Sequence, residues 1–275
     1  MIQLVTDSSA DMPKELLEEY DIHVVPLTIS IDGIDYKEGV DIAPQEFYVK
    51  MFNSKNLPKT SQPSPGEFAE TFRKLSKKGS VLCLTISSSL SGTYQAACLG
   101  KEASGVDVKV IDTWAGSLAH GLQLIEVRKL EKQGKSIEEI VDYLERYKKQ
   151  SNILILLDTL ENIVKGGRLS KFQGSIAKML DIKVLLHNVE GKVEILEKIH
   201  GRRRFLNRAL DIIGERKENF TDIIFGITHV DNIRDAEYLK KEIIKRYAPK
   251  DVIINYMGAT MGTYAGKDGM ILSFY

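Results

Sequence analysis

The residues best suited to chemistry lie in one hydroxyl-rich corner of the chain. Val81–Ile86 is an apolar run that predicts a strand, and Tyr94–Ala103 predicts a helix. Ser91–Thr93 therefore lies at a helix N-terminus, where free backbone N–H groups and the positive end of the helix dipole favour an anion. Ser89 or Ser91 could equally serve as an ordinary helix cap. The corner thus predicts either an anion-binding site or a cap.

A second loop presents hydroxyl groups on a stiffened backbone. Two prolines flank Ser64, which predicts the N-cap of a helix over Gly66–Lys77, with Glu67 completing a capping box. Thr60 and Ser61 have no such structural role. Like the hydroxyls of the corner, they are neutral donors, which suit one small anionic head group rather than a triphosphate.

Polar residues also follow the first predicted strand, Ile2–Val5. Open α/β sheets bind ligands beyond the carboxyl ends of their strands, so Asp7, Ser8 and Ser9 could line a site. They could instead cap the helix predicted at Lys14–Tyr20. Both interpretations stay open at this stage.

The sequence lacks the usual signatures of metal and nucleotide sites. Its five histidines are scattered, and HExxH, CxxC, Walker A and GxGxxG patterns are absent, so we expect no metal and no cofactor. The GxSxG nucleophile motif is absent too. A Ser-His-Asp triad could still form from distant residues, for instance Ser91 with His120 or His229. The alternative function is therefore a serine-dependent hydrolase or phosphotransfer enzyme acting on a small carboxylate or phosphate.

Three consecutive cations open the helix predicted at Arg202–Arg216. The helix dipole slightly disfavours positive charge at this end, so Arg202, Arg203 and Arg204 hint at an anionic partner. A solvated charge run is the more frequent explanation of such a pattern.

Composition excludes several classes of protein. The 275 residues include 38 basic and 38 acidic side chains, and this balance argues against a general nucleic-acid or anionic-membrane binder. The chain enters a strand at once, so we expect no signal peptide, and no apolar run approaches the ~20 residues that span a bilayer. We therefore expect a cytoplasmic protein in which Cys83 and Cys98 are unpaired core residues.

Strands and helices alternate over residues 1–150, which predicts a mostly parallel sheet flanked by helices. A strand is expected over His23–Ile31, followed by a hairpin that turns at Asp32-Gly33 and returns along Ile34–Lys37. This half should also contain one more strand, Val106–Ile111. Its remaining expected helices are Pro44–Phe52, Gly116–Lys132 and Ile137–Lys149.

A second α/β domain is expected from about residue 151, with the boundary near Gln150-Ser151. Its expected helices are Thr159–Val164, Phe172–Leu180, Arg202–Arg216 and Asn232–Tyr247. Its expected strands are Asn152–Leu157, Ile182–Leu186, Lys192–Ile199, Asp222–Val230, Val252–Met257 and Met270–Tyr275. The fold class is therefore α/β, with two domains at residues 1–150 and 151–275.

Five motifs occur in a fixed order along nearly the whole chain: Thr6–Asp11, Thr60–Phe68, Ile86–Gln95, Asp158–Arg168 and Gly258–Thr263. Their combination resembles the DegV family of bacterial fatty-acid-binding proteins. The resemblance implies one long-chain fatty acid bound between the two domains. Its carboxylate would be held by hydroxyl-bearing loops of the first domain, and its tail would be enclosed in an apolar tunnel closed by the second.

The resemblance also implies roles for single residues. Thr60, Ser61 and Ser91 would bind the carboxylate, helped by the N–H of Gly92. Residues expected near the head group are Arg168, Thr263 and Tyr264. Two positions depart from the family pattern. Tyr264 stands where a histidine is usual and cannot titrate near neutral pH, and His200 stands where an arginine is often found.

Family members similar to this chain are carriers rather than enzymes. They present the fatty acid to a separate fatty acid kinase subunit, which phosphorylates the carboxylate for phospholipid synthesis. Arg202, Arg203 and Arg204 would dock that kinase. The partners so implied are a fatty acid and a kinase subunit, with no nucleic acid and no stable membrane insertion.

Overall fold

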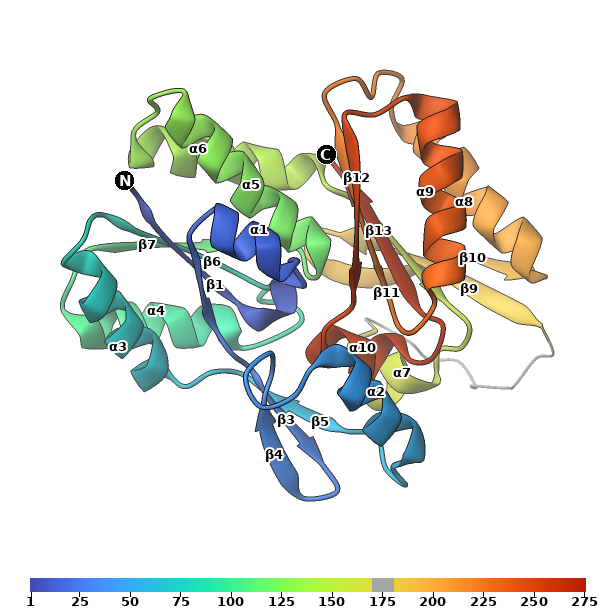
Figure 1. Ribbon diagram of the computed structural model, residues 1–275, viewed down its shortest axis with the longest axis horizontal. Coiled ribbons are helices and arrows are strands. Elements are labelled where there is room, and N and C mark those ends of the chain that lie inside the picture. The colour runs from blue at the N-terminus through green and yellow to red at the C-terminus, as the bar shows by residue number, and fades with distance from the viewer. Residues whose placement is uncertain (170–180) are drawn as a thin grey trace.

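The computed structural model describes residues 1–169 and 181–275, in which the strands form three sheets (Figure 1). The helix expected at Phe172–Leu180 lies outside the described residues. Two short 3₁₀ helices, η1 (Ser8–Ala10) and η2 (Lys148–Gln150), join larger elements.

The first sheet is entirely parallel, as predicted, with the strand order β2-β1-β6-β7. Its strands are β1 (Gln3–Asp7), β2 (Ile22–Val25), β6 (Val81–Thr85) and β7 (Val108–Asp112). One face is covered by α1 (Lys14–Glu19), α5 (Leu118–Lys132) and α6 (Ile137–Tyr147). The other face is covered by α3 (Pro65–Ser76) and α4 (Thr93–Ser104).

Alternation along the strands explains why helices lie on both faces. Leu82 and Leu84 pack toward α5 and α6, whereas Cys83, between them on β6, packs toward α3 and α4. A strand that is apolar on both sides must be buried on both sides, which is typical of parallel sheets. Both cysteines, Cys83 and Cys98, are free, as predicted.

The single strand expected at His23–Ile31 is wrong. Pro26 interrupts it, because proline has no N–H to donate to a ladder, and the two pieces join different sheets. The second piece, β3 (Thr28–Ile31), lies between β4 (Ile34–Lys37) and β5 (Lys59–Ser61) in an antiparallel sheet. The hairpin turn between β3 and β4 is confirmed, with positive φ at Asp32 and Gly33. Helix α2 (Pro44–Asn53) follows the hairpin.

The third sheet is mixed, with the strand order β10-β9-β8-β13-β11-β12. Its strands are β8 (Asn152–Leu157), β9 (Ile182–Val189), β10 (Lys192–His200), β11 (Ile224–His229), β12 (Asp251–Tyr256) and β13 (Met270–Phe274). Helices α8 (Arg202–Arg216) and α9 (Ile233–Tyr247) cover one face. The short helices α7 (Glu161–Lys165) and α10 (Ala259–Ala265) lie at the other.

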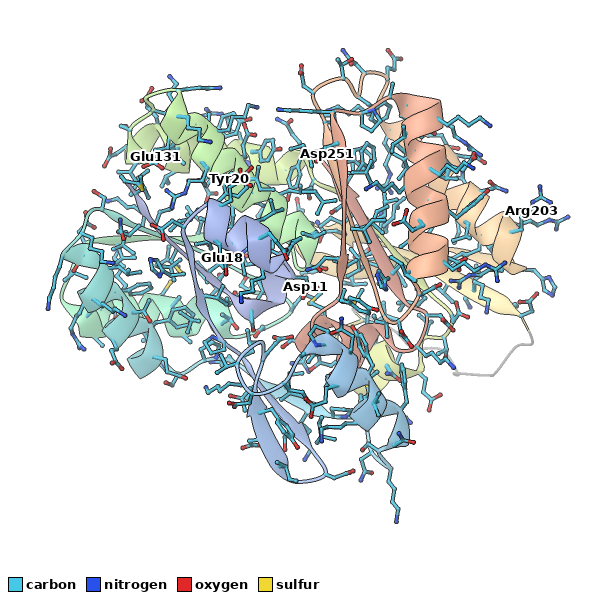
Figure 2. All side chains as sticks on the ribbon, in the orientation of Figure 1. Asp11, Glu18, Tyr20, Glu131, Arg203 and Asp251 are labelled. Carbon is cyan, nitrogen blue, oxygen red and sulfur yellow. The ribbon has the colours of Figure 1, made fainter. Side chains whose placement is uncertain are left out.

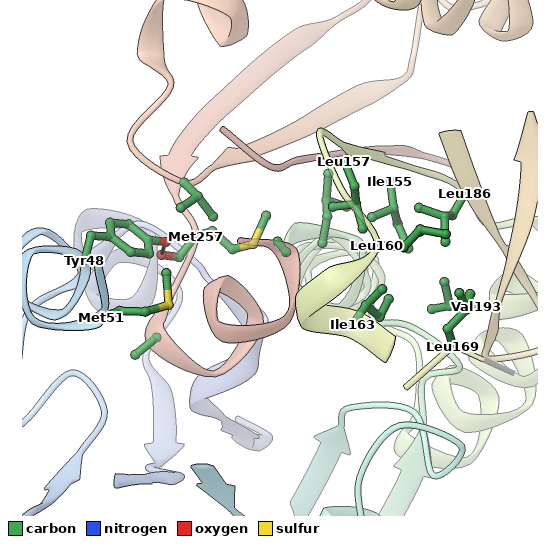
Figure 3. Packing of buried hydrophobic residues seen from close by; sticks show 14 of the residues in the cluster. Tyr48, Met51, Ile155, Leu157, Leu160, Ile163, Leu169, Leu186, Val193 and Met257 are labelled. Atoms are coloured by element: carbon green, nitrogen blue, oxygen red, sulfur yellow. Dashed lines mark hydrogen bonds between the residues drawn. The ribbon is translucent and has the colours of Figure 1, made fainter. Parts of the chain in front are cut away.

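Strand β8 links the two large cores of the sheet. Leu154 and Leu156 face the core under α8 and α9, whereas Ile153, Ile155 and Leu157 face the opposite core. Figure 3 shows Ile155 and Leu157 in this second core, to which Tyr48 of α2 also belongs. The first and last parts of the chain therefore share one apolar core.

The sheets divide on either side of residue 150, and the domain boundary near Gln150-Ser151 stays our prediction. The halves also meet at the last residue, where the Tyr275 hydroxyl donates to the Ala119 carbonyl at 2.8 Å. In the ranges 1–169 and 181–275, no helix has both the length and the apolar character required to cross a membrane.

The capping box of α3 gives the first testable prediction. The Glu67 N–H donates to Ser64 Oγ at 3.3 Å, and the Ser64 N–H donates to Glu67 Oε2 at 2.7 Å. Ser64→Ala should lower the free energy of unfolding by about 1 kcal/mol, because an orphan N–H of the first turn loses its acceptor. Urea unfolding should show this loss, whereas Ser80→Ala at an exposed serine without a cap role should change stability by less than about 0.5 kcal/mol. Equal midpoints for both variants would contradict the capping role.

Candidate functional site

The strand order of the parallel sheet locates the place where a ligand would bind. From β1 the chain continues to β2 on one side, and from β6 it continues to β7 on the other. Open α/β sheets bind ligands at this switch point, beyond the carboxyl ends of the strands. The corner Ile86–Thr93 leaves β6 there, and a cleft opens beside it.

The cleft is largely apolar and is built by both halves of the chain. It contains about 770 Å³ of empty space, including the part open to solvent. The first half contributes Leu27, Ile86, Leu90, Ala115 and Gly116. The six-stranded sheet contributes Ile153, Ile155, Leu157, Val193 and Ile271. The long apolar floor along β8 suits a hydrocarbon chain.

A small set of polar side chains lines the same cleft. Thr60 of β5 and Tyr264 of α10 meet across it, with their hydroxyl oxygens 2.5 Å apart. Ser91 and Arg168 also line the cleft, and Arg168 is its one charged side chain among the described residues. Thus two residues predicted to bind the carboxylate, Thr60 and Ser91, and two predicted neighbours of the head group, Arg168 and Tyr264, line the same cleft.

Arg168 is held in place without a carboxylate partner in the described part of the chain. Its Nη1 donates to the Gly166 carbonyl at 2.6 Å, and its Nε donates to the Leu90 carbonyl at 3.2 Å. Its guanidinium carbon also lies 4.7 Å from the centroid of the Tyr264 ring. These contacts fix the orientation of the cation but leave its charge uncompensated.

Gly166 makes room for the Tyr264 ring. A Cβ atom at position 166 would clash with ring carbons Cδ1 and Cε1 of Tyr264. The absence of a side chain therefore allows the ring to lie between α7 and Arg168, with its hydroxyl directed at Thr60.

The corner after β6 is not an ordinary cap. The N-cap of α4 is Gly92, and no side chain caps it. Ser91 Oγ lies 2.9 Å from Thr93 Oγ1 and accepts a long hydrogen bond, 3.4 Å, from the Thr93 N–H. Ser89 does not cap α4 either. Ser91 thus lines the cleft with its hydroxyl in contact with Thr93 on the first turn of α4.

Three residues expected at the head group do not line the cleft. Ser61 is exposed, because it follows Thr60 on β5 and points to the other side of the strand. Gly92 is exposed beside the side chain of Gln62. Thr263 is fully buried, and its hydroxyl donates to the Ala259 carbonyl at 2.8 Å.

The polar residues after β1 have structural roles. Asp7 caps η1 by accepting from the Ser9 N–H at 3.0 Å, and its other oxygen accepts from the Ile86 N–H at 2.8 Å. Ser8 Oγ donates to Glu38 at 2.6 Å. The predicted capping of the helix at Lys14–Tyr20 is wrong, because Asp7 caps η1 and the N-cap of α1, Pro13, has no side-chain hydrogen bond; none of the three residues lines the cleft.

The histidines considered for a triad are engaged elsewhere. His120 Nε2 lies 2.9 Å from Thr6 Oγ1, and His229 Nδ1 accepts from the Asn232 N–H at 3.1 Å. Neither lines the cleft, and burial lowers the pKa of both. A triad of either histidine with Ser91 is therefore not formed. Within the described ranges there is also no cluster of His, Cys, Asp or Glu that could hold a metal ion.

The three arginines of α8 differ in their environment. Arg202 pairs with Asp158 and also donates to Asp235 at 2.6 Å, while Lys183 binds Asp158 at 2.6 Å. Arg203 and Arg204 are exposed and form no ion pair with the rest of the described chain. Figure 2 shows Arg203 extending outward from the molecule.

Sequence reasoning missed several lining residues. Asn188 of β9 lines the cleft, and its amide donates to Ser151 Oγ at 3.3 Å. Met261 of α10 lies across from Gly116, where a Cβ would come within 2.9 Å of its Cε atom. Because side chains alternate between the two faces of β9, the sequence could have placed Asn188 on the same face as Val184 and Leu186. The position of α10 over the cleft, by contrast, depends on the tertiary structure.

Comparisons with known proteins agree on one family. Residues 1–275 match the family model described as "Uncharacterised protein, DegV family". A DegV domain-containing protein of Clostridium perfringens is 33% identical over 280 residues, which cover 98% of this chain and 96% of that protein.

Solved structures give the same result. A fatty-acid-binding DegV family protein from Thermus thermophilus superposes with a TM-score of 0.93 at 30% identity, covering 100% of this chain and 99% of that one. A DegV family protein from Ruminococcus gnavus, refined with vaccenic acid, has a TM-score of 0.91 at 25% identity, covering 99% of both chains.

The space at Gly166 gives the second prediction. Gly166→Ala should displace the Tyr264 ring and break its contact with Thr60, at a cost of about 1–3 kcal/mol for overpacking. Thermal unfolding should reveal the loss. The matched control is Gly66→Ala near the start of α3, where the added Cβ meets only Ser64 Oγ at 3.8 Å. An unchanged unfolding temperature for Gly166→Ala would show that the ring is not confined as described.

Proposed function

Because this chain belongs to the DegV family, we propose that it binds one long-chain fatty acid in the cleft beside β6 and β8. The relatives of known structure include proteins described as binding fatty acids. The carboxylate lies at Thr60, Ser91, Arg168 and Tyr264, and the tail lies along the apolar floor of the six-stranded sheet.

One observation carries this proposal: among the described residues, the lining of the apolar cleft includes a single cation, Arg168, without a carboxylate partner, together with the hydroxyl groups of Thr60, Ser91 and Tyr264. A neutral hydrocarbon would leave Arg168 without a counter-ion, and a small polar anion would leave the apolar floor uncovered. An amphiphile with one negative head and a long tail satisfies both parts of the site.

The tail and the head group of the fatty acid contribute differently to the free energy of binding. Each buried CH₂ group contributes roughly 0.8 kcal/mol, so a long tail supplies most of the affinity. The head group then needs only a few donors to fix its orientation. Arg168 supplies the charge-assisted hydrogen bond, which is stronger than a neutral one.

The hydroxyl groups can adapt to a carboxylate. Thr60 and Tyr264 now share one hydrogen bond, and rotation about each C–O bond would redirect the protons toward a carboxylate oxygen. Ser91 would donate in the same way from the opposite loop. Ser61 and Thr263 are left out, because the former is exposed and the latter is engaged. The N–H of Gly92 stays an auxiliary donor at most.

We further propose that the protein is a cytoplasmic carrier that presents the fatty acid to a separate kinase subunit and performs no catalysis itself. The exposed guanidinium groups of Arg203 and Arg204, placed at the start of α8, suit an acidic partner surface. Arg202 is already committed to Asp158 and Asp235, so its contribution to docking is indirect.

Affinity measurements on Ser91 test the site. Ser91→Ala should weaken the binding of a fluorescent long-chain fatty acid to delipidated protein about tenfold, because a hydrogen bond to a charged group contributes roughly 1.5 kcal/mol or more. Ser89→Ala, on the same corner but outside the cleft lining, is the matched control and should bind normally. Equal affinity of both variants would remove Ser91 from the site.

Charge reversal tests the docking surface. Replacing both Arg203 and Arg204 by Glu should reduce phosphorylation of the bound fatty acid by the kinase subunit of the source cell. Binding of the fatty acid itself should be unchanged, because both side chains lie outside the cleft. Lys77→Glu with Lys78→Glu makes the same charge change at the end of α3 and should leave phosphorylation intact. If both double variants behave alike, α8 does not dock the kinase.

A further inference from the structure

Three buried carboxylates lie together beside the start of α10, around a second hollow and outside the lining of the cleft. Asp7 is fully buried, and Asp11 and Glu38 are each only 6% exposed. No Lys, Arg or His forms an ion pair with any of them in residues 1–169 and 181–275. Buried carboxylates without a cation are costly, so their retention calls for an explanation.

Asp11 and Glu38 are held only by N–H and O–H donors, several of them more than two hundred residues away. Asp11 accepts from the Gly258 N–H at 2.9 Å and from Ser117 Oγ at 2.6 Å. Glu38 accepts from both the N–H and the hydroxyl of Thr260, each at 2.7 Å. The two carboxylates therefore fasten the start of α10 to the first half of the chain.

Both carboxylates crowd the same residue. A Cβ on Gly258 would lie 2.5 Å from Asp11 Oδ1 and 2.6 Å from Glu38 Oε1. Asp11 is labelled in Figure 2, just before the start of α1. We call Asp11, Glu38, Gly258 and Thr260 the carboxylate junction.

Helix α10 connects this junction to the cleft. The junction contacts the start of the helix at Gly258 and Thr260. Thr260 also lines the cleft, together with Met261, Tyr264 and Ala265 of the same helix. Tyr264 lies one helical turn beyond Thr260, so a shift at the junction moves its hydroxyl relative to Thr60.

We propose that Asp11 and Glu38 are positioning residues whose charge state sets how firmly α10 is held against the cleft. Proton uptake at the junction strengthens retention of the bound anion, and proton loss speeds its release. This inference rests on the proposed function, because it concerns exchange of the same ligand.

The stability of the carboxylate junction should fall as pH rises. Burial, and then the charge of Glu38, raise the pKa of Asp11 well above its ordinary value, and burial raises the pKa of Glu38. Groups with raised pKa values stabilise the folded protein most below their unfolded pKa values, near pH 4, and this stabilisation is lost as pH rises through the folded values. Mutual repulsion at the junction therefore grows toward neutral and alkaline pH.

Other titratable groups around the junction do not reverse this pH dependence. Asp7 of β1 lies near both carboxylates, and its charge also raises the pKa of Asp11 and of Glu38. Burial raises the pKa of the Tyr48 hydroxyl on α2 well above its ordinary value, which keeps it neutral. Tyr256 of β12 and Lys14 of α1 line the outer hollow, and Lys14 pairs with the exposed Glu18.

The test is the rate at which a fluorescent long-chain fatty acid leaves the full-length protein at pH 5 and pH 8. The wild type should release it at least about fivefold faster at pH 8, the lower end of ordinary coupling between two sites. Glu38→Gln should give nearly equal rates, because it removes the charge. Its amide oxygen can still accept from the Thr260 N–H, and its amide N–H can donate to the Ser8 and Thr260 hydroxyls.

Two further variants complete the test. Asp11→Asn should flatten the profile in the same way, and it serves if Glu38→Gln does not fold. Glu46→Gln, the same chemical change at an exposed site on α2, should keep the wild-type profile. A wild-type rate independent of pH, or a pH dependence that survives in both junction variants, would overturn the inference.

Thermal unfolding without fatty acid separates this inference from the proposed function. Raising pH from 5 to 8 should lower the unfolding temperature of the wild type more than that of Glu38→Gln or Asp11→Asn. If the protein binds no fatty acid, the proposed function fails. A pH dependence of the unfolding temperature that is larger in the wild type than in the variants would then show that the junction titrates but does not regulate fatty-acid release. If fatty acid binds and the unfolding profiles coincide, the junction proposal alone fails.

Discussion

Strand β8 is apolar on both faces, and the need to cover both faces determines how the molecule is built around the cleft. Leu154 and Leu156 are covered by α8 and α9, which leaves Ile153, Ile155 and Leu157 to be covered from the other side. That cover comes from α7, α10 and parts of the first half of the chain, which do not fill the space completely. The remaining volume is a cleft with a hydrocarbon floor, shared between segments that are far apart in sequence.

Electrostatics then restricts what the cleft can hold. Arg168 is fixed by two backbone carbonyls and by the ring of Tyr264, none of which neutralises it. Beside the start of α10, Asp11 and Glu38 are buried and form no ion pair with a cation of the described chain. Helix α10 thus contacts both the ring-stacked Arg168, through Tyr264, and the buried carboxylates, through Thr260. We propose that this arrangement connects the binding of an anionic head group to the protonation of Asp11 and Glu38.

Local signals predicted a large part of this structure, and long-range contacts account for the rest. The capping box of Ser64 and Glu67, the hairpin turn and the alternation of strands and helices depend on neighbouring residues, and all were confirmed. The corner at Ser91 was also visible locally. The resemblance to DegV proteins, rather than spacing, pointed to Arg168 and Tyr264. By contrast, the exposure of Ser61 depends on the pairing of β5, and Gly258 and Thr260, which bind Asp11 and Glu38, lie more than two hundred residues away from them. No sequence pattern predicted those contacts.

The central claim is that an amphiphilic anion occupies the cleft, and native mass spectrometry of the protein as purified from lipid-containing cells tests it most directly. Occupation of the cleft by such an anion predicts a one-to-one complex whose ligand, released by a denaturing organic solvent, has the mass of a long-chain fatty acid. It also predicts that Arg168→Gln markedly reduces the fraction of protein in that complex. Protein that repeatedly carries no ligand, or only a small anion without an acyl chain, would contradict the account.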